Sequence, residues 1–357
     1  MILTKERALW AGNVYSPGNP HVFATPDGTG FTVTSGSDLH RVSASDASLL
    51  RTTTTGLMDA CAPDALTGGC FVLTVKNLAL RPFPDGAAIP LGTVAKGAAL
   101  AFDPHSRRLL SGGSGGFRAW SIPAGGAAVN SLHRLSQLVV GVSGNPGLGL
   151  SKSVVKQFAP AEHKAASLGL DRAAAVSALA WSPSGRLIAW AGTARDKKKG
   201  AWIVDAATAR DTTAFLPSEA ITQLRFTADE TACLAATRRE LLCYDAATGT
   251  VRWRISHYRT VRDPICFAAA ANSPRLAAAL APDSVSLLDA ATGAVLLTLT
   301  HPVTRTVRAL DLSPDGNRLC VLAGTLAQVW SLEAVDTEIS GYKSKQLPAV
   351  PSPDKSQ

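Results

Sequence analysis

The chain has 357 residues, of which 46% are hydrophobic, 6% aromatic and 17% charged. This length is sufficient for one large domain or two, and a charged share below the usual value of about 25% excludes a disordered polyelectrolyte. The net charge of +8 and the isoelectric point near 9.3 permit an acidic or nucleic-acid partner without requiring one.

The N-terminus and the cysteines indicate a soluble protein in a reducing, intracellular compartment. Lys5, Glu6 and Arg7 lie where a signal peptide would need an apolar core, and no run approaches the ~18 apolar residues of a membrane span. The six cysteines form no C-x-x-C pair, and most lie in apolar runs, where a free cysteine acts as a small hydrophobic residue. We therefore expect no disulfide framework.

Two turn signals recur along the chain. The first is a turn rich in Pro, Asp, Gly and Ser between two strand-like runs, at Thr25–Gly28, Asp103–Ser106, Ser182–Gly185, Thr227–Glu230, Asn272–Pro274 and Ser313–Gly316. The second, DAATG, occurs at Asp245–Gly249 and Asp289–Gly293, and a variant ending in Ala occurs at Asp205–Ala209. Apolar runs flank each copy, which predicts a hairpin whose aspartate caps the turn.

Together the two signals divide the chain into eight units of about 40 residues: 22–53, 57–93, 97–130, 131–170, 175–218, 220–257, 264–301 and 306–335. Most units contain four short strand-like runs, and long helical periodicity is absent. Four short strands per ~40 residues are typical of a β-propeller blade, whereas a β-sandwich would lack so regular a period. We therefore predict an all-β propeller with eight sequence units and seven or eight four-stranded blades.

The two ends of the chain have different predicted roles. The last unit shows three strands before the chain turns polar, so the N-terminal segment 1–21 is expected to supply the missing strand, through Ala8–Trp10 or Asn13–Tyr15. The propeller is then predicted to span 22–340. Residues 341–357 are rich in Pro, Ser and Lys and predict a disordered tail.

These units resemble the WD40-repeat family of β-propellers. The likeness lies in VRALDLSPDG (Val307–Gly316), VSALAWSPSG (Val176–Gly185) and the Trp-Ser pairs Trp120-Ser121 and Trp330-Ser331, where the family has Trp-Asp. A narrower resemblance, over Gly12–Thr52, is to the WD-repeat subunits of the t-UTP module of the small-subunit processome. It implies a role in ribosome biogenesis, specifically in pre-rRNA processing.

Neither H-E-x-x-H nor the P-loop motif is present, and we identify no catalytic or metal-binding constellation. Gly112–Gly116 lies between two strand-like runs and predicts a hairpin turn rather than a phosphate loop. His257 and His301 share an equivalent position, and we interpret them as loop histidines. The inner-strand positions Ala178 and Leu310 are small or apolar, which disfavours an enzyme with a site in the channel. We expect no catalytic activity, cofactor or metal.

Basic residues cluster in the loops predicted to share one face, opposite the DAATG turns. This candidate docking face comprises Lys152, Arg195, Lys197, Lys198, Lys199, Arg238, Arg239, Arg254, His257, Arg259, Arg262 and Arg305. It is either an ordinary set of charged loops or a surface that binds RNA phosphate or an acidic protein segment.

The function that these features predict is a non-catalytic scaffold for protein–protein contacts in a large assembly, with RNA or an acidic segment as the alternative ligands of the basic face. The expected setting is ribosome biogenesis in the nucleus and nucleolus. The alternative is a cytoplasmic WD-repeat adaptor that recruits a partner to a ubiquitin ligase or to a cytoskeletal or transport complex. The fold alone does not separate these roles, because propellers host many functions.

Overall fold

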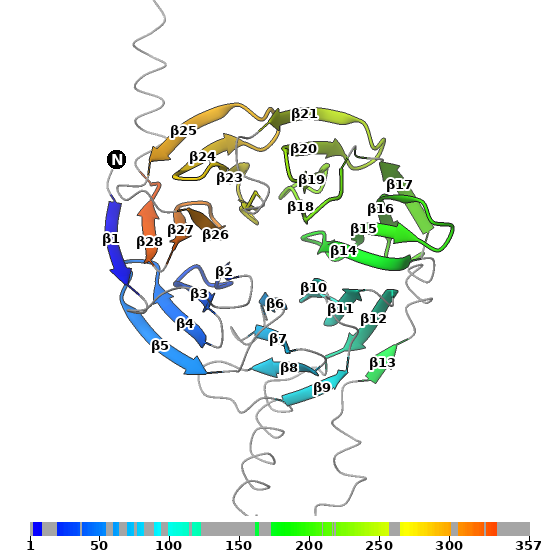
Figure 1. Cartoon of the computed structure of the whole chain (residues 1–357), viewed down its shortest axis with the longest axis horizontal. Coiled ribbons are helices and arrows are strands. Elements are labelled where there is room, and N and C mark those ends of the chain that lie inside the picture. The colour runs from blue at the N-terminus through cyan, green and yellow to red at the C-terminus, as the bar shows by residue number, and fades with distance from the viewer. Residues whose placement is uncertain are drawn as a thin grey trace, which may run out of the picture.

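The structure of the chain is a computed structural model (Figure 1). It describes residues 3–8, 20–35, 38–54, 60–63, 70–74, 77–81, 89–93, 99–113, 116–122, 161–163, 173–208, 210–215, 217, 219–256, 265–300, 306–324 and 326–333. Within these ranges all regular elements are β-strands. The predicted tail, 341–357, lies outside them.

Small antiparallel sheets arranged in a ring form a β-propeller, and the described residues contain seven such sheets of four strands each (Figure 1). The innermost strands are β2 (His21–Ala24), β6 (Ala60–Pro63), β10 (Ala99–Asp103), β14 (Ala173–Trp181), β18 (Gln223–Phe226), β22 (Phe267–Ala269) and β26 (Val307–Leu312). The second strands are β3 (Gly30–Ser35), β7 (Cys70–Thr74), β11 (Arg108–Gly113), β15 (Leu187–Ala194), β19 (Ala232–Ala236), β23 (Arg275–Ala281) and β27 (Arg318–Ala323).

The third and outermost strands complete each sheet. The third strands are β4 (Asp38–Ser43), β8 (Asn77–Arg81), β12 (Gly116–Ser121), β16 (Lys199–Asp205), β20 (Glu240–Asp245), β24 (Ser284–Asp289) and β28 (Leu326–Ser331). The outermost strands are β5 (Leu49–Thr54), β9 (Ile89–Thr93), β13 (Ala161–His163), β17 (Arg210–Phe215), β21 (Val251–Ser256), β25 (Val295–Thr300) and β1 (Leu3–Ala8).

The N-terminal and C-terminal strands share one sheet. β1 pairs antiparallel with β28, and Leu3 lies opposite Trp330 while Ala8 lies opposite Leu326. The sequence predicts the added strand at Ala8–Trp10 or Asn13–Tyr15, whereas the strand that pairs ends at Ala8. Backbone pairing between the two ends of the chain therefore completes the sheet of β26, β27 and β28.

The predicted unit 131–170 has no sheet of its own in the described part of the chain. Its described residues, 161–163, form β13, which pairs with β12 and completes the sheet that begins with β10. Residues 123–160, which separate these two strands in the sequence, lie outside the described ranges. Turn spacing cannot reveal this arrangement, because hydrogen bonding with β12 decides which segment becomes the outermost strand.

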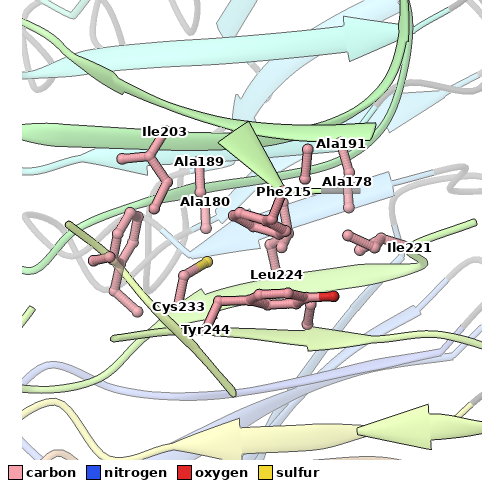
Figure 2. Close-up of a cluster of buried hydrophobic side chains, with 14 of the residues drawn as sticks. Ala178, Ala180, Ala189, Ala191, Ile203, Phe215, Ile221, Leu224, Cys233 and Tyr244 are labelled. Atoms are coloured by element: carbon pink, nitrogen blue, oxygen red, sulfur yellow. The ribbon is translucent and has the colours of Figure 1, made fainter. Parts of the chain in front are cut away.

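Apolar side chains fill the space between neighbouring sheets. Figure 2 shows the cluster between the sheet of β14–β17 and the sheet of β18–β21, where small alanines of β14 and β15 face larger side chains. Phe215 and Tyr244 stack there with ring centroids 4.1 Å apart. At the interface between the sheet of β10–β13 and the sheet of β14–β17, Trp190 stacks on Trp202 with ring centroids 4.2 Å apart and contacts Phe117 edge to face. Burial on both faces explains why these strands are continuous apolar runs.

The DAATG segments form the hairpin turns that the sequence predicts. Asp245 Oδ1 accepts hydrogen bonds from the backbone N–H of Ala247 at 3.0 Å and of Thr248 at 2.8 Å, and from the Thr248 hydroxyl at 3.0 Å. Asp289 receives the N–H and the hydroxyl of Thr292 in the same way. The carboxylate thus satisfies the backbone of its own turn.

Each of these two turns also binds the outermost strand of the preceding sheet. Trp253 of β21 donates its Nε1–H to the carbonyl of Ala290 at 3.1 Å, and the hydroxyl of Thr213 in β17 donates to the carbonyl of Ala247 at 2.8 Å. A Cβ on Gly293 would lie only 2.7 Å from Cδ2 of Trp253. The DAATG turn is therefore a junction between sheets as well as a hairpin turn.

A second junction lies on the innermost strands. Asp311 of β26 is buried, and its Oδ2 accepts the backbone N–H of Ala24 in β2 at 2.8 Å. Its Oδ1 lies 3.4 Å from Nη2 of Arg225, which belongs to β18, on the far side of the intervening sheet of β22–β25. Burial raises the pKa of Asp311, and the Arg225 guanidinium partly opposes this rise.

Replacing Gly293 by Ala is expected to destabilise the fold more than the same change at Gly28. Both glycines have a left-handed backbone conformation, with φ of 72° at Gly293 and 69° at Gly28, so each substitution incurs about 1–2 kcal/mol of backbone strain. Only the Gly293→Ala variant would also bring a methyl group into collision with Trp253, because the nearest atom at position 28 is Pro314 Cδ at 3.9 Å. Urea unfolding of both variants measures the difference, and equal losses would contradict the junction.

Asp311→Ala is expected to lower the free energy of unfolding by about 1–3 kcal/mol, because it leaves the half-buried N–H of Ala24 without its acceptor. Asp311→Asn keeps an acceptor and is expected to stay within about 1 kcal/mol of the wild type.

The raised pKa of Asp311 means that the folded state binds the proton of this carboxyl group more tightly than the unfolded state does. The wild type therefore loses stability relative to Asp311→Asn as pH rises through the acidic range. Urea unfolding of both proteins across that range measures the difference, and a wild type that gains stability on Asp311→Asn with rising pH would contradict the assignment.

Candidate docking face

Two basic loops lie at one end of the propeller. Arg195–Lys198 connects β15 to β16, and Arg238-Arg239 connects β19 to β20. Both loops join a second strand to a third strand, so they lie at the end opposite the DAATG turns, which join third strands to outermost strands. We call these the loop end and the turn end. The two sheets are neighbours in the ring, so the loops project from the same end of adjacent sheets (Figure 1).

The first loop is a tight hairpin with three residues at its tip. The N–H of Lys197 donates to the carbonyl of Ala194 at 2.9 Å, and the N–H of Ala194 donates to the carbonyl of Lys198 at 2.8 Å. Lys197 has φ of 67°, the left-handed conformation that normally favours glycine at this position. The side chain of Lys197 is exposed, so the loop holds a positive charge at its tip in a strained backbone conformation.

Three of the basic side chains have acidic partners. The pairs are Lys198–Asp196 at 3.2 Å, Arg239–Glu219 at 3.2 Å and Arg254–Glu240 at 3.8 Å. The basic partners are 61–81% exposed, so each pair contributes only about 0.2–1 kcal/mol. The backbone N–H of Lys198 lowers the pKa of Asp196, which stays ionised at neutral pH.

Four other basic residues have no acidic partner in the described part of the chain: Arg195, Lys197, Lys199 and Arg238. All four are exposed. They come from two neighbouring sheets and lie at the same end of the propeller. We call these four residues the unpaired cations, and their side chains remain available to an external anion.

The remaining predicted residues of the face, Lys152, His257, Arg259, Arg262 and Arg305, lie outside the described residues. The sequence prediction of the docking face did not include the acidic partners Asp196, Glu219 and Glu240. Asp196 and Glu240 adjoin the basic runs in the sequence and could have been found there. Glu219 could not, because it precedes β18 and reaches Arg239 only through the fold of that sheet.

The other sequence candidates have structural roles. Strand β11 ends at Gly113 and strand β12 begins at Gly116. These two glycines pair with each other, so β11 and β12 form a hairpin at this glycine-rich segment. Within the described ranges, no group of three or more His, Cys, Asp or Glu side chains is placed to hold a metal ion. The same residues contain no helix with the length and apolar character needed to cross a bilayer.

Comparison with models of known protein families and a search of curated proteins both found no match for this chain. The likeness to WD40 propellers accordingly concerns the fold: a ring of small antiparallel sheets, consistent with that type of propeller.

Lys197→Gly is expected to raise the free energy of unfolding by about 1 kcal/mol, because glycine adopts the left-handed conformation without strain. Lys199→Gly is the matched control: it removes the same charge from the first residue of β16, where φ is not left-handed, and is expected to lower stability by about 0.5–1 kcal/mol. Thermal unfolding of both variants measures the contrast, and a destabilised Lys197→Gly would overturn the interpretation.

Proposed function

We propose that this chain is a non-catalytic propeller scaffold that binds an anionic partner at its loop end within a larger assembly. The observation that carries the proposal is the set of unpaired cations, which project from two adjacent sheets and form no ion pair with a carboxylate of the described residues. These four side chains are exposed and lie outside the packed core of the propeller, which supports the same interpretation. Loops on a rigid scaffold commonly carry binding residues.

The turn end offers a contrast. Its carboxylates are largely engaged in hydrogen bonds to their own turns: Asp245 and Asp289 cap the DAATG hairpins, and Asp27 and Asp315 receive backbone N–H groups of the Pro-Asp turns. Arg252 forms an ion pair with Asp245 at 2.8 Å. The polar side chains of the turn end therefore stabilise the fold, whereas the unpaired cations of the loop end have no such structural task.

The assembly that we propose is one of ribosome biogenesis and pre-rRNA processing, with the chain in the nucleus and nucleolus. Basic charge and the resemblance of Gly12–Thr52 to WD-repeat subunits of the small-subunit processome support this setting. A cytoplasmic adaptor for a ubiquitin ligase or a transport complex would use the same loop end, so the identity of the co-purifying proteins distinguishes the two.

The proposal is tested by affinity purification from the source cells, with mass spectrometry and sedimentation of the tagged chain. The wild type is compared with Lys199→Gln/Arg238→Gln and with the turn-end control Arg186→Gln/Arg210→Gln, which removes the same charge from exposed positions. We expect sedimentation with pre-ribosomal particles, and loss of partners only for the loop-end variant. Identical partners for all three proteins would refute the docking role, and partners from a cytoplasmic machine would refute the ribosomal setting.

A further inference from the structure

We infer that the loop end recognises an acidic polypeptide segment whose carboxylates are spaced apart, rather than a nucleic-acid backbone. The inference rests on the proposed docking role and specifies the chemistry of the partner. Three features of the described residues carry it: the alternation of charge at the loop end, the character of its exposed side chains, and the conformation of Lys197.

Charge at the loop end alternates over short distances. Asp196 lies between Arg195 and Lys197 in the first loop, Glu240 follows Arg239 in the second loop, and Glu219 contacts Arg239. Single-stranded nucleic acid carries a negative charge on every nucleotide, so a bound strand would bring phosphates close to these carboxylates. A polypeptide can place glutamate or aspartate opposite the unpaired cations and neutral residues opposite the carboxylates, which avoids that repulsion.

No aromatic side chain is exposed in the described part of the loop end. The exposed large hydrophobic side chains of the described chain are Leu50, Val251 and Val295, and all three lie near the start of outermost strands, towards the turn end. Single-stranded nucleic acid usually gains about 1–3 kcal/mol per base from stacking on aromatic rings. The loop end offers mainly charge and hydrogen-bond donors, which match carboxylates.

Lys197 holds its charge in a conformation that favours glycine. Glu230 is a comparable case, with φ of 58°, but its carboxylate accepts the hydroxyl of Ser184 in the neighbouring sheet at 2.8 Å, which offsets the strain. Lys197 has no such contact among the described residues. A charge kept at a strained position with no internal partner indicates that the ammonium group serves an external ligand.

The unpaired cations supply two kinds of contact to such a ligand. The guanidinium groups of Arg195 and Arg238 can each bind a carboxylate through two parallel N–H···O hydrogen bonds, which fixes its orientation. Lys197 and Lys199 act as point charges with freely turning donors. An extended acidic segment lying across the two neighbouring loops would contact both pairs at once.

Fluorescence anisotropy tests the inference with two labelled probes: a Glu-Ser-Gly repeat peptide and oligouridylate RNA of equal charge. We expect the peptide to bind more tightly than the RNA, and a peptide with Gln in place of Glu to lose binding. Lys197→Gly is expected to weaken peptide binding roughly 2- to 5-fold while raising thermal stability, and Lys199→Gln/Arg238→Gln to weaken it roughly 3- to 10-fold. The turn-end control Arg186→Gln/Arg210→Gln should bind as the wild type does.

Tighter binding of the RNA, absence of binding to both probes, or unchanged peptide affinity in Lys197→Gly would each overturn the inference. These outcomes differ from failure of the proposed function. If the loop-end variant loses its cellular partners but the RNA binds better than the peptide, the docking role stands and only the chemistry of the partner is wrong. If the variant keeps all its cellular partners, the docking role itself fails.

Discussion

The contact between one sheet and the turn of the next is the interaction on which the ring depends. A propeller sheet packs mainly against its two neighbours, so its position is determined largely at those two interfaces. The DAATG turn meets this need with few atoms: its aspartate satisfies the turn, its glycine allows close approach, and an alanine carbonyl accepts a hydrogen bond from the preceding sheet. Apolar side chains then fill the interface behind this polar contact.

This use of polar groups separates the two ends of the molecule. At the turn end, carboxylates, hydroxyls and arginines are engaged in capping and in contacts between sheets, such as Arg275 with the carbonyl of Gly316 at 2.7 Å. At the loop end, short hairpin connections satisfy their own backbone and leave side chains exposed. Loop residues can therefore differ in charge without disturbing the ring.

Local chemistry explains which features are predictable. The caps of Asp245 and Asp289, the hairpin at Gly112–Gly116 and the opposite placement of DAATG turns and basic loops all follow from residues close together in the sequence. The pairing of Arg239 with Glu219 and of Arg225 with Asp311 does not, because each joins residues far apart in the sequence that only the fold brings together. The strand β13 shows the same limit, since only its hydrogen bonds to β12 assign it to a sheet.

The sequence by itself determined the propeller class, because alternating apolar runs and repeated Asp/Gly turns are short-range patterns set by side-chain burial and backbone conformation. It also identified the basic residues of the docking face and the end of the propeller at which those within the described ranges lie. Only the tertiary structure decided which cations remain available, because neutralisation depends on distances between side chains brought together by the ring. Among the described basic residues of the face, the ion pairs of Lys198, Arg239 and Arg254 leave Arg195, Lys197, Lys199 and Arg238.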